Sequence, residues 1–479
     1  MQLKLPIFIL ISFLFPRILF AQIAELTAHH EVKDSIVARF NRNDFNSIYH
    51  LADTSSFHRS EQTFTKFLRN YKNNYGQILK AAFLSDSVCE GCNSKRAKYY
   101  LLEFQLKTFL MLLEVTPSKK FSSFGILNYT YPERTGTSMI KTNNPLSNSF
   151  DLSIDSAARG YFENPYATGL SIGIIKNGKR FTYHYGEITK GSGQLPTDKT
   201  LYEIGSVTKT FTATILANAV LENRLRLNDD IRKYLPETYP NLEYKGRAIT
   251  LQDLSNHSAR IPSEPDDYFT QPKYDLMKPW NDYSTSMLWQ SLHRVVIDTF
   301  PGYKFQYSNA GVSVLGHILE KVYNLPFDEL IKKYITDPMK MKNTDAMMNN
   351  KIRKQMASKY SSNGNLVPYW NQPAFTPAGV GMHSCLGDML NYLQYQIAEE
   401  DSAIKLTHQP TINNLGLGWG VGNLGTIWRK LEHNGGTGGF ASSIKAFPEI
   451  KTGLVILVNA DTDTDLTKLI RRLSSVIVR

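Results

Sequence analysis

The sequence predicts an α+β protein: an antiparallel sheet flanked by helices and interrupted by a helical subdomain, with a small α+β domain in front of it. Strand-like stretches lie at both ends of residues 150–479, and helical patterns fill the middle. Residues 23–131 show helical patterns followed by a run of strands, which is typical of a separate α+β domain. Between the two, residues 132–149 are rich in Ser, Thr, Asn and Pro and lack hydrophobic periodicity, which indicates a linker.

Residues 1–21 have the pattern of a secretory signal peptide. Lys4 gives a positive start, an apolar run follows, and Ala21 is a small residue suited to cleavage. Pro16 and Arg17 interrupt the apolar run, so it would make a poor membrane span, and an uncleaved interfacial anchor is the alternative. We therefore expect a periplasmic or secreted protein that meets the membrane only through this transient peptide.

The charge balance is basic, with 54 Lys and Arg against 43 Asp and Glu, a formal charge of +11. Such a surface could favour anionic envelopes, acidic polymers or nucleic acid. No long Lys/Arg run, zinc-finger spacing or aromatic RNA-binding motif accompanies it. We expect a basic soluble protein without a nucleic-acid partner, and the sequence does not predict the oligomeric state.

Three cysteines are present. Cys89-Glu-Gly-Cys92 could close a small disulfide loop after export, or could remain two thiols. No second CxxC pair follows, so a four-thiolate zinc site has no support. Cys385 is expected to be a buried small apolar residue. We expect neither a metal nor a cofactor.

The first domain is expected to contain helices followed by strands. Residues 24–42 place Val32, Ile36, Val37 and Phe40 on one helical face. Asp44 is suited to cap a short second helix. The further expected elements are a helix over 60–74 and strands over 77–85, 96–105, 107–115 and 123–131. No convergent set of catalytic side chains lies there, so binding, docking or spacing is its expected role.

The second domain begins near Phe150 with a helix over 151–163. Asn177-Gly178 is a strong hairpin turn between two strand patterns. Because strands return only near the chain end, we expect the terminal strands to share one antiparallel sheet. The expected strands are 169–176, 180–187, 416–421, 426–433, 440–447 and 454–459, and the last expected helix is 465–478.

The first motif with chemical potential is Ser206-Val-Thr-Lys209, followed by an apolar helical pattern. A serine and a lysine three positions apart on a helix share a face. A serine hydroxyl becomes a good nucleophile only when a neighbouring group takes its proton, and a desolvated lysine can do so. Taken alone, a capping serine and a solvated lysine explain the pattern equally well.

The second motif is Tyr307-Ser-Asn309, which precedes another helical pattern. A tyrosine phenol whose pKa is lowered by a lysine can act as general base and then as acid. Asn309, two residues on, can point to the same side of an extended segment and hydrogen-bond a substrate amide. A packed tyrosine and a helix-capping asparagine are the alternative.

The third motif is His433-Asn-Gly435-Gly436-Thr-Gly-Gly439, which we expect between two strands. Its glycines let the backbone approach a ligand closely. The N–H groups of Gly436 and Ser206 could form an oxyanion hole. His433 could present a donor or a positive charge to a substrate carboxylate, although a Gly-rich hairpin with a structural histidine is the plainer interpretation.

Together, S-x-x-K, Y-x-N and H-x-G in this order resemble the penicillin-recognising serine hydrolase superfamily, specifically its class C β-lactamase-related branch. That branch includes β-lactamases, D-Ala-D-Ala carboxypeptidases, D-aminopeptidases and esterases. The resemblance runs from about residue 150 to 478 and implies the β-lactamase/transpeptidase-like fold. Further framework stretches that match are 202–211, 227–230, 234–236, 249–258, 377–379 and 416–419. More weakly, residues 23–131 resemble the cone-shaped, cystatin-like or nuclear-transport-factor-like domains that precede some bacterial serine hydrolases.

The resemblance implies a role for each motif residue. Ser206 would attack the carbonyl, and Lys209 and Tyr307 would accept its proton, in an order that the sequence does not settle. Asn309 would orient the substrate, and His433 stands where many members have lysine. Gly435 completes the H-x-G motif, and the N–H of Gly436 would match the strand donor of the oxyanion hole. These are the catalytic and substrate-binding residues that we expect.

Two departures from the family pattern bear on the substrate. Histidine in place of lysine at 433 is common among peptidase- and esterase-like members, which weakens the case for a dedicated β-lactamase. The literal Lys451-Thr-Gly is rejected as the motif because a hairpin turn belongs there. In the segment His257-Ser-Ala-Arg260-Ile-Pro262, arginine replaces the usual glycine and adds a charge near the expected entrance, while His257 is predicted to be a structural hydrogen-bonding residue.

The expected function is hydrolysis of amide or ester bonds through an acyl-enzyme. D-amino-acid peptides, possible peptidoglycan fragments among them, fit the family and the expected location; small esters come next and β-lactams last. The alternative is a catalytically weak penicillin- or muropeptide-binding protein that acts as a sensor or docking module. A nucleic-acid or surface-binding role is supported only by the excess of basic residues.

Overall fold

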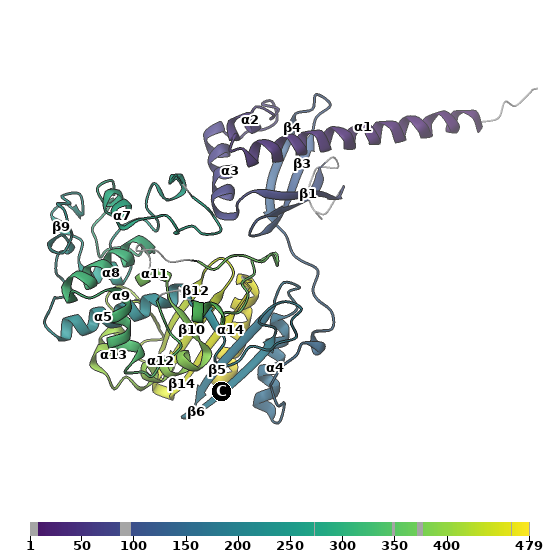
Figure 1. The fold of residues 1–479 in the computed structure, drawn as a ribbon. Coiled ribbons are helices and arrows are strands. Elements are labelled where there is room, and N and C mark those ends of the chain that lie inside the picture. Colours follow the sequence, from purple (N-terminus) through teal and green to yellow (C-terminus); the bar gives the residue numbers. More distant parts are fainter. Residues whose placement is uncertain are drawn as a thin grey trace, which may run out of the picture. The chain divides into compact units, whose positions relative to one another are not determined.

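A computed structural model describes residues 8–86, 97–272, 274–346, 350–370, 377–460 and 462–478. Cys89 and Cys92, for which the sequence leaves a disulfide loop or two thiols open, lie outside the described residues. The chain divides into two compact units, Met1–Tyr131 and Pro132–Arg479 (Figure 1). Each unit is described by itself.

In the first unit, helices pack on one face of an antiparallel sheet whose strands pair in chain order (Figure 1). Asp44 caps the second helix by accepting from Ser47 N, as predicted, and Ser60 caps the third. The fourth strand begins two residues earlier than predicted, at Phe121, whose ring is fully buried. The elements are α1 (Phe8–Asn41), α2 (Phe45–Tyr49), α3 (Glu61–Tyr75), β1 (Ile78–Ser85), β2 (Lys98–Phe104), β3 (Thr108–Val115) and β4 (Phe121–Asn128).

Helix α1 carries the predicted apolar face on its C-terminal half, where Val32, Ile36 and Phe40 are buried in the core of the unit. The helix also includes residues 8–21, which the sequence assigned to the signal peptide. Among the described residues, no helix has the length and apolar character needed to cross a membrane. The signal peptide and the exported location stay predictions.

The second unit is built on a sheet in the order β11-β12-β13-β14-β5-β6, with every neighbouring pair antiparallel (Figure 1). Residues 452–458 pair with residues 170–176, so strands from the two ends of the unit share one antiparallel sheet, as predicted. The strands are β5 (Gly169–Lys176), β6 (Lys179–Gly186), β11 (Gly420–Gly422), β12 (Lys430–Gly436), β13 (Ala441–Phe447) and β14 (Thr452–Val458).

Two predicted strands are wrong in their bounds. The strand expected over 416–421 is limited to β11, because residues 416–419 form a turn in which Gly418 has a φ of +69° and lies against α5. The strand expected over 426–433 begins only at Lys430 and runs on to Gly436, so the H-x-G part of the third motif and Gly436 lie inside β12, and residues 437–439 follow it. This part of the motif is therefore held by sheet hydrogen bonds to β13.

Helices cover both faces of this sheet. Helices α4 (Ser149–Tyr161) and α14 (Asp463–Ile477) pack together on one face, and α12 (Leu386–Ala398) lies on the other, where the helical subdomain follows (Figure 1). The remaining elements are η1 (Thr137–Met139), β7 (Leu201–Glu203), η2 (Gly205–Val207), α5 (Thr208–Leu221), η3 (Ile231–Lys233), β8 (Glu243–Tyr244), β9 (Arg247–Ala248), α6 (Leu251–Ser255), η4 (Tyr268–Thr270), α7 (Thr285–Leu292), α8 (Asn309–Tyr323), α9 (Phe327–Ile331), η5 (Lys332–Thr336), α10 (Asn350–Arg353), α11 (Pro377–Val380), β10 (His383–Cys385), α13 (Ser402–Thr407) and η6 (Pro448–Ile450).

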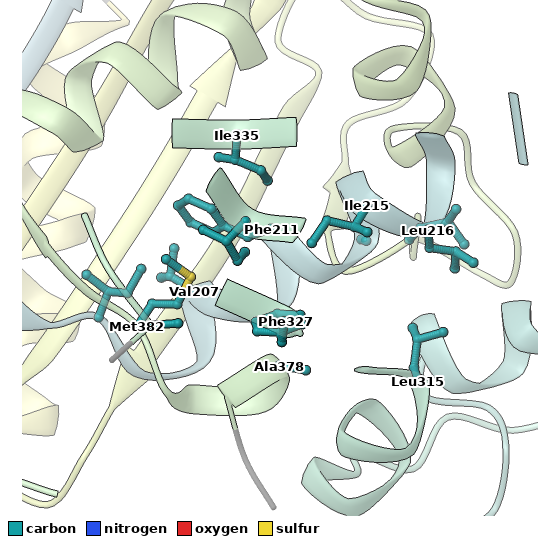
Figure 2. Packing of buried hydrophobic residues seen from close by; sticks show 14 of the residues in the cluster. Val207, Phe211, Ile215, Leu216, Leu315, Phe327, Ile335, Ala378 and Met382 are labelled. Carbon is teal, nitrogen blue, oxygen red and sulfur yellow. The ribbon is translucent and has the colours of Figure 1, made fainter. Parts of the chain in front are cut away.

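Helix α5 is enclosed on all sides by this subdomain. Phe211 stacks on Tyr392 at 4.1 Å between ring centroids, and Figure 2 shows the apolar side chains that surround the helix. Burial of this much apolar surface stabilises the position of the helix strongly. The packed residues labelled in Figure 2 are Val207, Phe211, Ile215, Leu216, Leu315, Phe327, Ile335, Ala378 and Met382. The N-terminal end of a rigid helix therefore carries the first motif.

Candidate active site

Ser206 lies in the short turn η2, between the end of strand β7 and the start of α5. Gly205 directly before it has a φ of +54°, a conformation that glycine adopts without strain, which makes the sharp turn from strand to helix possible. The Ser206 side chain is only partly buried. A nucleophile in this position is open to a substrate while its backbone is fixed.

The structure brings the three predicted catalytic side chains together. The phenol of Tyr307 donates to Ser206 Oγ at 2.6 Å, and Lys209 Nζ donates to the same oxygen at 3.0 Å. Lys209 Nζ also lies 4.9 Å from the centroid of the Tyr307 ring. The hydroxyl of Ser206 is therefore within hydrogen-bond distance of both the amine and the phenol.

Lys209 is 1% exposed, and its amine is surrounded by oxygen acceptors. Besides Ser206, Nζ donates to Asn309 Oδ1 at 2.7 Å and to the carbonyl of Gly379 at 2.8 Å. Burial lowers the pKa of Lys209 to about 7, while the charge of Glu264 opposes this shift. A substantial fraction of the amine is therefore unprotonated near neutral pH and able to take a proton.

Tyr307 could act as a base only if its pKa were lowered, and its surroundings act in the other direction. Burial raises the pKa of its phenol to about 12, the hydrogen bond to Ser206 lowers it in part, and the charge of Glu264 raises it further. The condition for Tyr307 to act as a base, a pKa lowered by the lysine, is not met, because desolvation of the phenolate outweighs the favourable contacts. At neutral pH Tyr307 is a neutral hydrogen-bond donor.

The glycines of the third motif lie against the nucleophile turn. A Cβ atom on Gly435 would come within 2.9 Å of Ser206 N and would collide with the carbonyl of Ile204. A Cβ atom on Gly205 would lie 2.6 Å from Gly436 N. Only glycine allows this close backbone approach. The backbone nitrogens of Ser206 and Gly436 therefore both lie close to Gly205, where the two donors of the predicted oxyanion hole are expected.

His433 lies on β12, two residues before Gly435. Its Nδ1 is 2.8 Å from the carbonyl of Asn434, and because a carbonyl only accepts, Nδ1 carries the proton and Nε2 presents a lone pair. Burial and the charge of Lys209 lower the pKa of His433 to about 4. The ring is uncharged at neutral pH, so the expected positive charge for a substrate carboxylate is absent, and in this tautomer so is the Nε2 donor.

Asn309 is in the site, but its amide makes contacts that the sequence did not predict. Its Oδ1 accepts from Lys209, and its Nδ2 donates to Glu264 Oε1 at 2.7 Å. One of the two N–H groups expected to hold the substrate therefore holds Glu264 instead. Burial raises the pKa of Glu264 to about 7, against the lowering effect of the contacts with Asn309, Lys209 and Ser263.

In the segment 257–262, which departs from the family pattern, His257 and Arg260 both make side-chain contacts. His257 Nδ1 accepts from Ser308 N at 3.2 Å, and its ring lies 4.4 Å from the ring of Tyr307, so its contacts support the neighbouring Tyr-Ser-Asn segment, as predicted. Arg260 has a φ of +63°, where the family usually has glycine. Its guanidinium forms two 2.8 Å contacts with Asp298, so the added charge is paired.

Sequence reasoning missed a buried ion pair beside the nucleophile turn. Glu203, the last residue of β7, accepts from Lys359 Nζ at 2.7 Å and from Trp370 N at 2.7 Å. Both charged side chains are 2% exposed or less. A Cβ atom on Gly439 would collide with Lys359, so this pair also packs against the Gly-rich loop after β12. Glu203 lies within the matched stretch 202–211, but nothing in the sequence names its distant partner.

The literal Lys451-Thr-Gly does not lie with the catalytic residues. Lys451 has a φ of +48° and ends the turn between β13 and β14. The other end of β13, at Ala441, pairs with Gly436, so a whole strand separates the two motifs. Its rejection is confirmed. Among the described residues, no group of three or more His, Cys, Asp or Glu side chains is placed to hold a metal ion.

Comparison with known proteins agrees with this geometry. The chain is 29% identical over 353 residues to Protein flp of Staphylococcus aureus (strain MRSA252), covering 70% of this chain and 67% of that protein. It is 28% identical over 265 residues to a beta-lactamase of Providencia stuartii, covering 54% of this chain and 63% of that protein.

Solved structures show the same fold. A beta-lactamase/D-alanine carboxypeptidase from Pseudomonas syringae superposes with a TM-score of 0.60 at 22% identity, over 68% of this chain and 99% of that one. The corresponding protein from Yersinia pestis gives a TM-score of 0.56 at 23% identity, over 69% and 99%. The family described as Beta-lactamase matches residues 154–476. The protein therefore belongs to the beta-lactamase family of serine hydrolases, and its second unit has the β-lactamase/transpeptidase-like fold.

Proposed function

We propose that the protein is an exported serine hydrolase that forms an acyl-enzyme at Ser206 and cleaves amide or ester bonds. The observation that carries the proposal is the pair of contacts on Ser206 Oγ, from Tyr307 at 2.6 Å and from Lys209 at 3.0 Å. A serine held between a buried amine and a phenol is the arrangement that nucleophilic catalysis requires.

The reaction begins with attack of Ser206 Oγ on the substrate carbonyl carbon. The hydroxyl proton passes to the unprotonated amine of Lys209, the group whose lowered pKa suits a base near neutral pH. The tetrahedral intermediate collapses as the bond to the leaving group breaks, and the phenol of Tyr307 gives that group a proton. Lys209 returns its proton to Tyr307, and water then hydrolyses the Ser206 ester by the same exchange in reverse.

The negative charge that develops on the substrate carbonyl oxygen must be stabilised by hydrogen-bond donors that are already in position. The amides of Ser206 and Gly436 fill this role in the proposal, because both lie close to Gly205 at the end of β12. A missing oxyanion donor typically costs about a hundredfold or more in rate. The need for glycine at 205 and 435 follows from this backbone approach.

The favoured substrates are D-amino-acid peptides or small esters, with β-lactams less favoured. Names of similar proteins, beta-lactamase and D-alanine carboxypeptidase, support an acyl-transfer chemistry of this class. The uncharged His433 disfavours substrates that depend on a positive charge at this position to bind a carboxylate. Substrates without a free carboxylate beside the scissile bond, such as D-aminoacyl amides and esters, fit the site better.

A fluorescent fluorophosphonate probe tests the nucleophile. We expect covalent labelling of the wild type, labelling of Ser153→Ala, which alters an exposed serine on α4, and no labelling of Ser206→Ala. Labelling that survives in Ser206→Ala would show that another residue is the nucleophile. The readout is in-gel fluorescence with the labelled residue located by mass spectrometry.

Turnover distinguishes an enzyme from a binding protein. Steady-state rates with nitrocefin, a D-Ala-D-Ala peptide, a D-aminoacyl amide and p-nitrophenyl esters would rank the substrate classes. We expect the ester and the D-aminoacyl amide to lead. A wild type that is labelled by penicillin but turns over none of these compounds would favour the alternative, a penicillin- or muropeptide-binding sensor.

A further inference from the structure

Glu264 is a buried carboxyl in the active site for which the proposed reaction has no step. Its Oε1 accepts from Asn309 Nδ2 at 2.7 Å and from Ser263 Oγ at 3.2 Å. Its Oε2 is enclosed and has no hydrogen-bond partner among the described residues. Burying a carboxyl with an unsatisfied oxygen costs free energy. A role in the site would account for its retention there.

The amide of Asn309 connects Glu264 to the catalytic amine. Its Oδ1 faces Lys209 Nζ and its Nδ2 faces Glu264. An ionised carboxylate only accepts hydrogen bonds, and an ammonium only donates them. A flipped amide would set oxygen against oxygen at Glu264 and N–H against N–H at Lys209, so Glu264 fixes the orientation in which Asn309 holds Lys209.

Glu264 also acts on the charge of Lys209. The other titratable groups that act on or face this amine are Tyr307 on the segment before α8, His257 on the segment after α6, and His433 on β12. Burial raises the pKa of Tyr307 to about 12, lowers that of His433 to about 4, and lowers that of His257 well below its usual value. These three are neutral near pH 7. Within the described part of the chain, Glu264 is the acidic group whose charge raises the pKa of Lys209.

We infer that Glu264 is a positioning residue for the proton acceptor: through Asn309 it holds the Lys209 amine against Ser206, and its carboxylate balances the charge of the protonated amine. The inference rests on the proposed function, because its readout is acylation of Ser206. It adds a residue outside the three motifs, two positions after Pro262. Ser263, its neighbour, is itself held by an Ala310 N to Ser263 O bond of 3.0 Å, which joins this segment to the start of α8.

Glu264→Gln separates the two parts of the role, because a glutamine oxygen still accepts from Asn309 Nδ2 but carries no charge. Without the carboxylate the ammonium form of Lys209 is less stable. Because the pKa of Glu264 is itself raised to about 7, its carboxylate is ionised in the upper part of the acid limb, the pH range in which Lys209 loses its proton. There the limb should move to lower pH in Glu264→Gln. At high pH, where the amine is neutral in both proteins, the two rates should agree within about threefold.

Glu264→Ala removes the acceptor as well as the charge. We expect the acid limb to move as in Glu264→Gln, and in addition the high-pH rate to fall by about tenfold or more, because Asn309 and Lys209 lose their fixed orientation. Glu237→Gln is the matched control: it removes an exposed carboxylate paired with His293, and should leave the profile unchanged. The measurement is the rate of fluorophosphonate labelling from pH 5 to 10, with Tm recorded for each variant.

The outcomes separate this inference from the proposed function. A wild type that is not labelled at Ser206 overturns the proposed function. A labelled wild type whose profile coincides with that of Glu264→Gln overturns the inference alone. The inference is also overturned if Glu264→Gln lowers the labelling rate equally at every pH and leaves the acid limb of the profile where it is in the wild type. That result would mark Glu264 as a merely structural residue. A rise in KM confined to substrates with a free ammonium group, again with the limb unmoved, would instead make Glu264 a substrate-binding residue.

Discussion

At the scale of single residues, the site works because burial acts on two groups in opposite senses. Desolvation disfavours a charged amine and a charged phenolate alike, so the pKa of Lys209 falls to about 7 while that of Tyr307 rises to about 12. The sequence left open which of the two takes the serine proton. The directions of these shifts favour Lys209 as base and Tyr307 as proton donor.

This assignment predicts the pH dependence of acylation. Below pH 7 Lys209 is an ammonium and cannot accept a proton, so the rate should rise with pH through about 7 and level off above it. Lys209→Ala and Tyr307→Phe should each slow acylation by at least ~100-fold. The residual activity of Tyr307→Phe should keep the limb near 7, and that of Lys209→Ala should lose it. Stopped-flow labelling across pH checks this, and a limb that disappears only in Tyr307→Phe would reverse the two roles.

The same residues show what a sequence can and cannot predict. Ser206, Lys209 and Tyr307 were identified because short motifs recur in a fixed order, and each is where the motif implies. Glu264 touches the same network, yet no motif marks it, because its contact with Asn309 joins positions 45 residues apart. Gly379 lies in the matched stretch 377–379, but its contact with Lys209, 170 residues away, was not predicted. The direction of the Tyr307 pKa shift could not be predicted either, since the degree of burial is a property of the folded chain.

At the scale of elements, the turn from β7 to α5 is held from both sides. The backbone of Gly435 packs against the turn itself, and the buried ion pair between Glu203 and Lys359 fixes the end of β7 that leads into it. Alternating and helical patterns predicted most element bounds to within a few residues, as for Gly169–Lys176. They failed at residues 416–433, where Gly418 breaks the strand pattern to let the chain pass close to α5.

The ion pair yields a stability prediction. Lys359→Met leaves Glu203 buried without its cation, which should lower the free energy of unfolding by about 3–5 kcal/mol. The double variant Glu203→Gln/Lys359→Met should lose clearly less than the sum of the single variants, because no charge is then stranded. The free energy of unfolding is measured by urea unfolding, followed by loss of Ser206 labelling, for the wild type, the two single variants and the double variant. Additive losses would mean that the two side chains stabilise the unit independently.

At the scale of the whole molecule, the boundary between the units falls at Tyr131, before the Ser/Thr/Asn/Pro-rich stretch that the sequence presented as a linker. Part of this stretch bonds to the second unit. Lys141 O accepts from Gly186 N at 2.9 Å, and Asn144 Nδ2 donates to Tyr185 at 2.8 Å. Asn148 caps α4 by accepting from Asp151 N at 3.0 Å. These residues belong structurally to the hydrolase unit.

Two fragments test this boundary. Residues 132–479 alone should fold and label at Ser206 at a rate near that of the full chain, because every described contact of Ser206 comes from within this range. Residues 150–479 should label as well but unfold earlier, since losing the helix cap alone costs about 1 kcal/mol. Thermal unfolding and labelling rates compare the two. An inactive 132–479 fragment would show that the first unit helps to form the site.

The acceptors around the Lys209 amine have a consequence for how the protein can be studied. Ser206, Asn309 and Gly379 reach that nitrogen from separate parts of the chain, one of them 170 positions away. Chemical reactivity at a single hydroxyl thus reports whether distant segments have found their native topology. A labelling assay doubles as a folding assay, sensitive to damage far from the atom that carries the label.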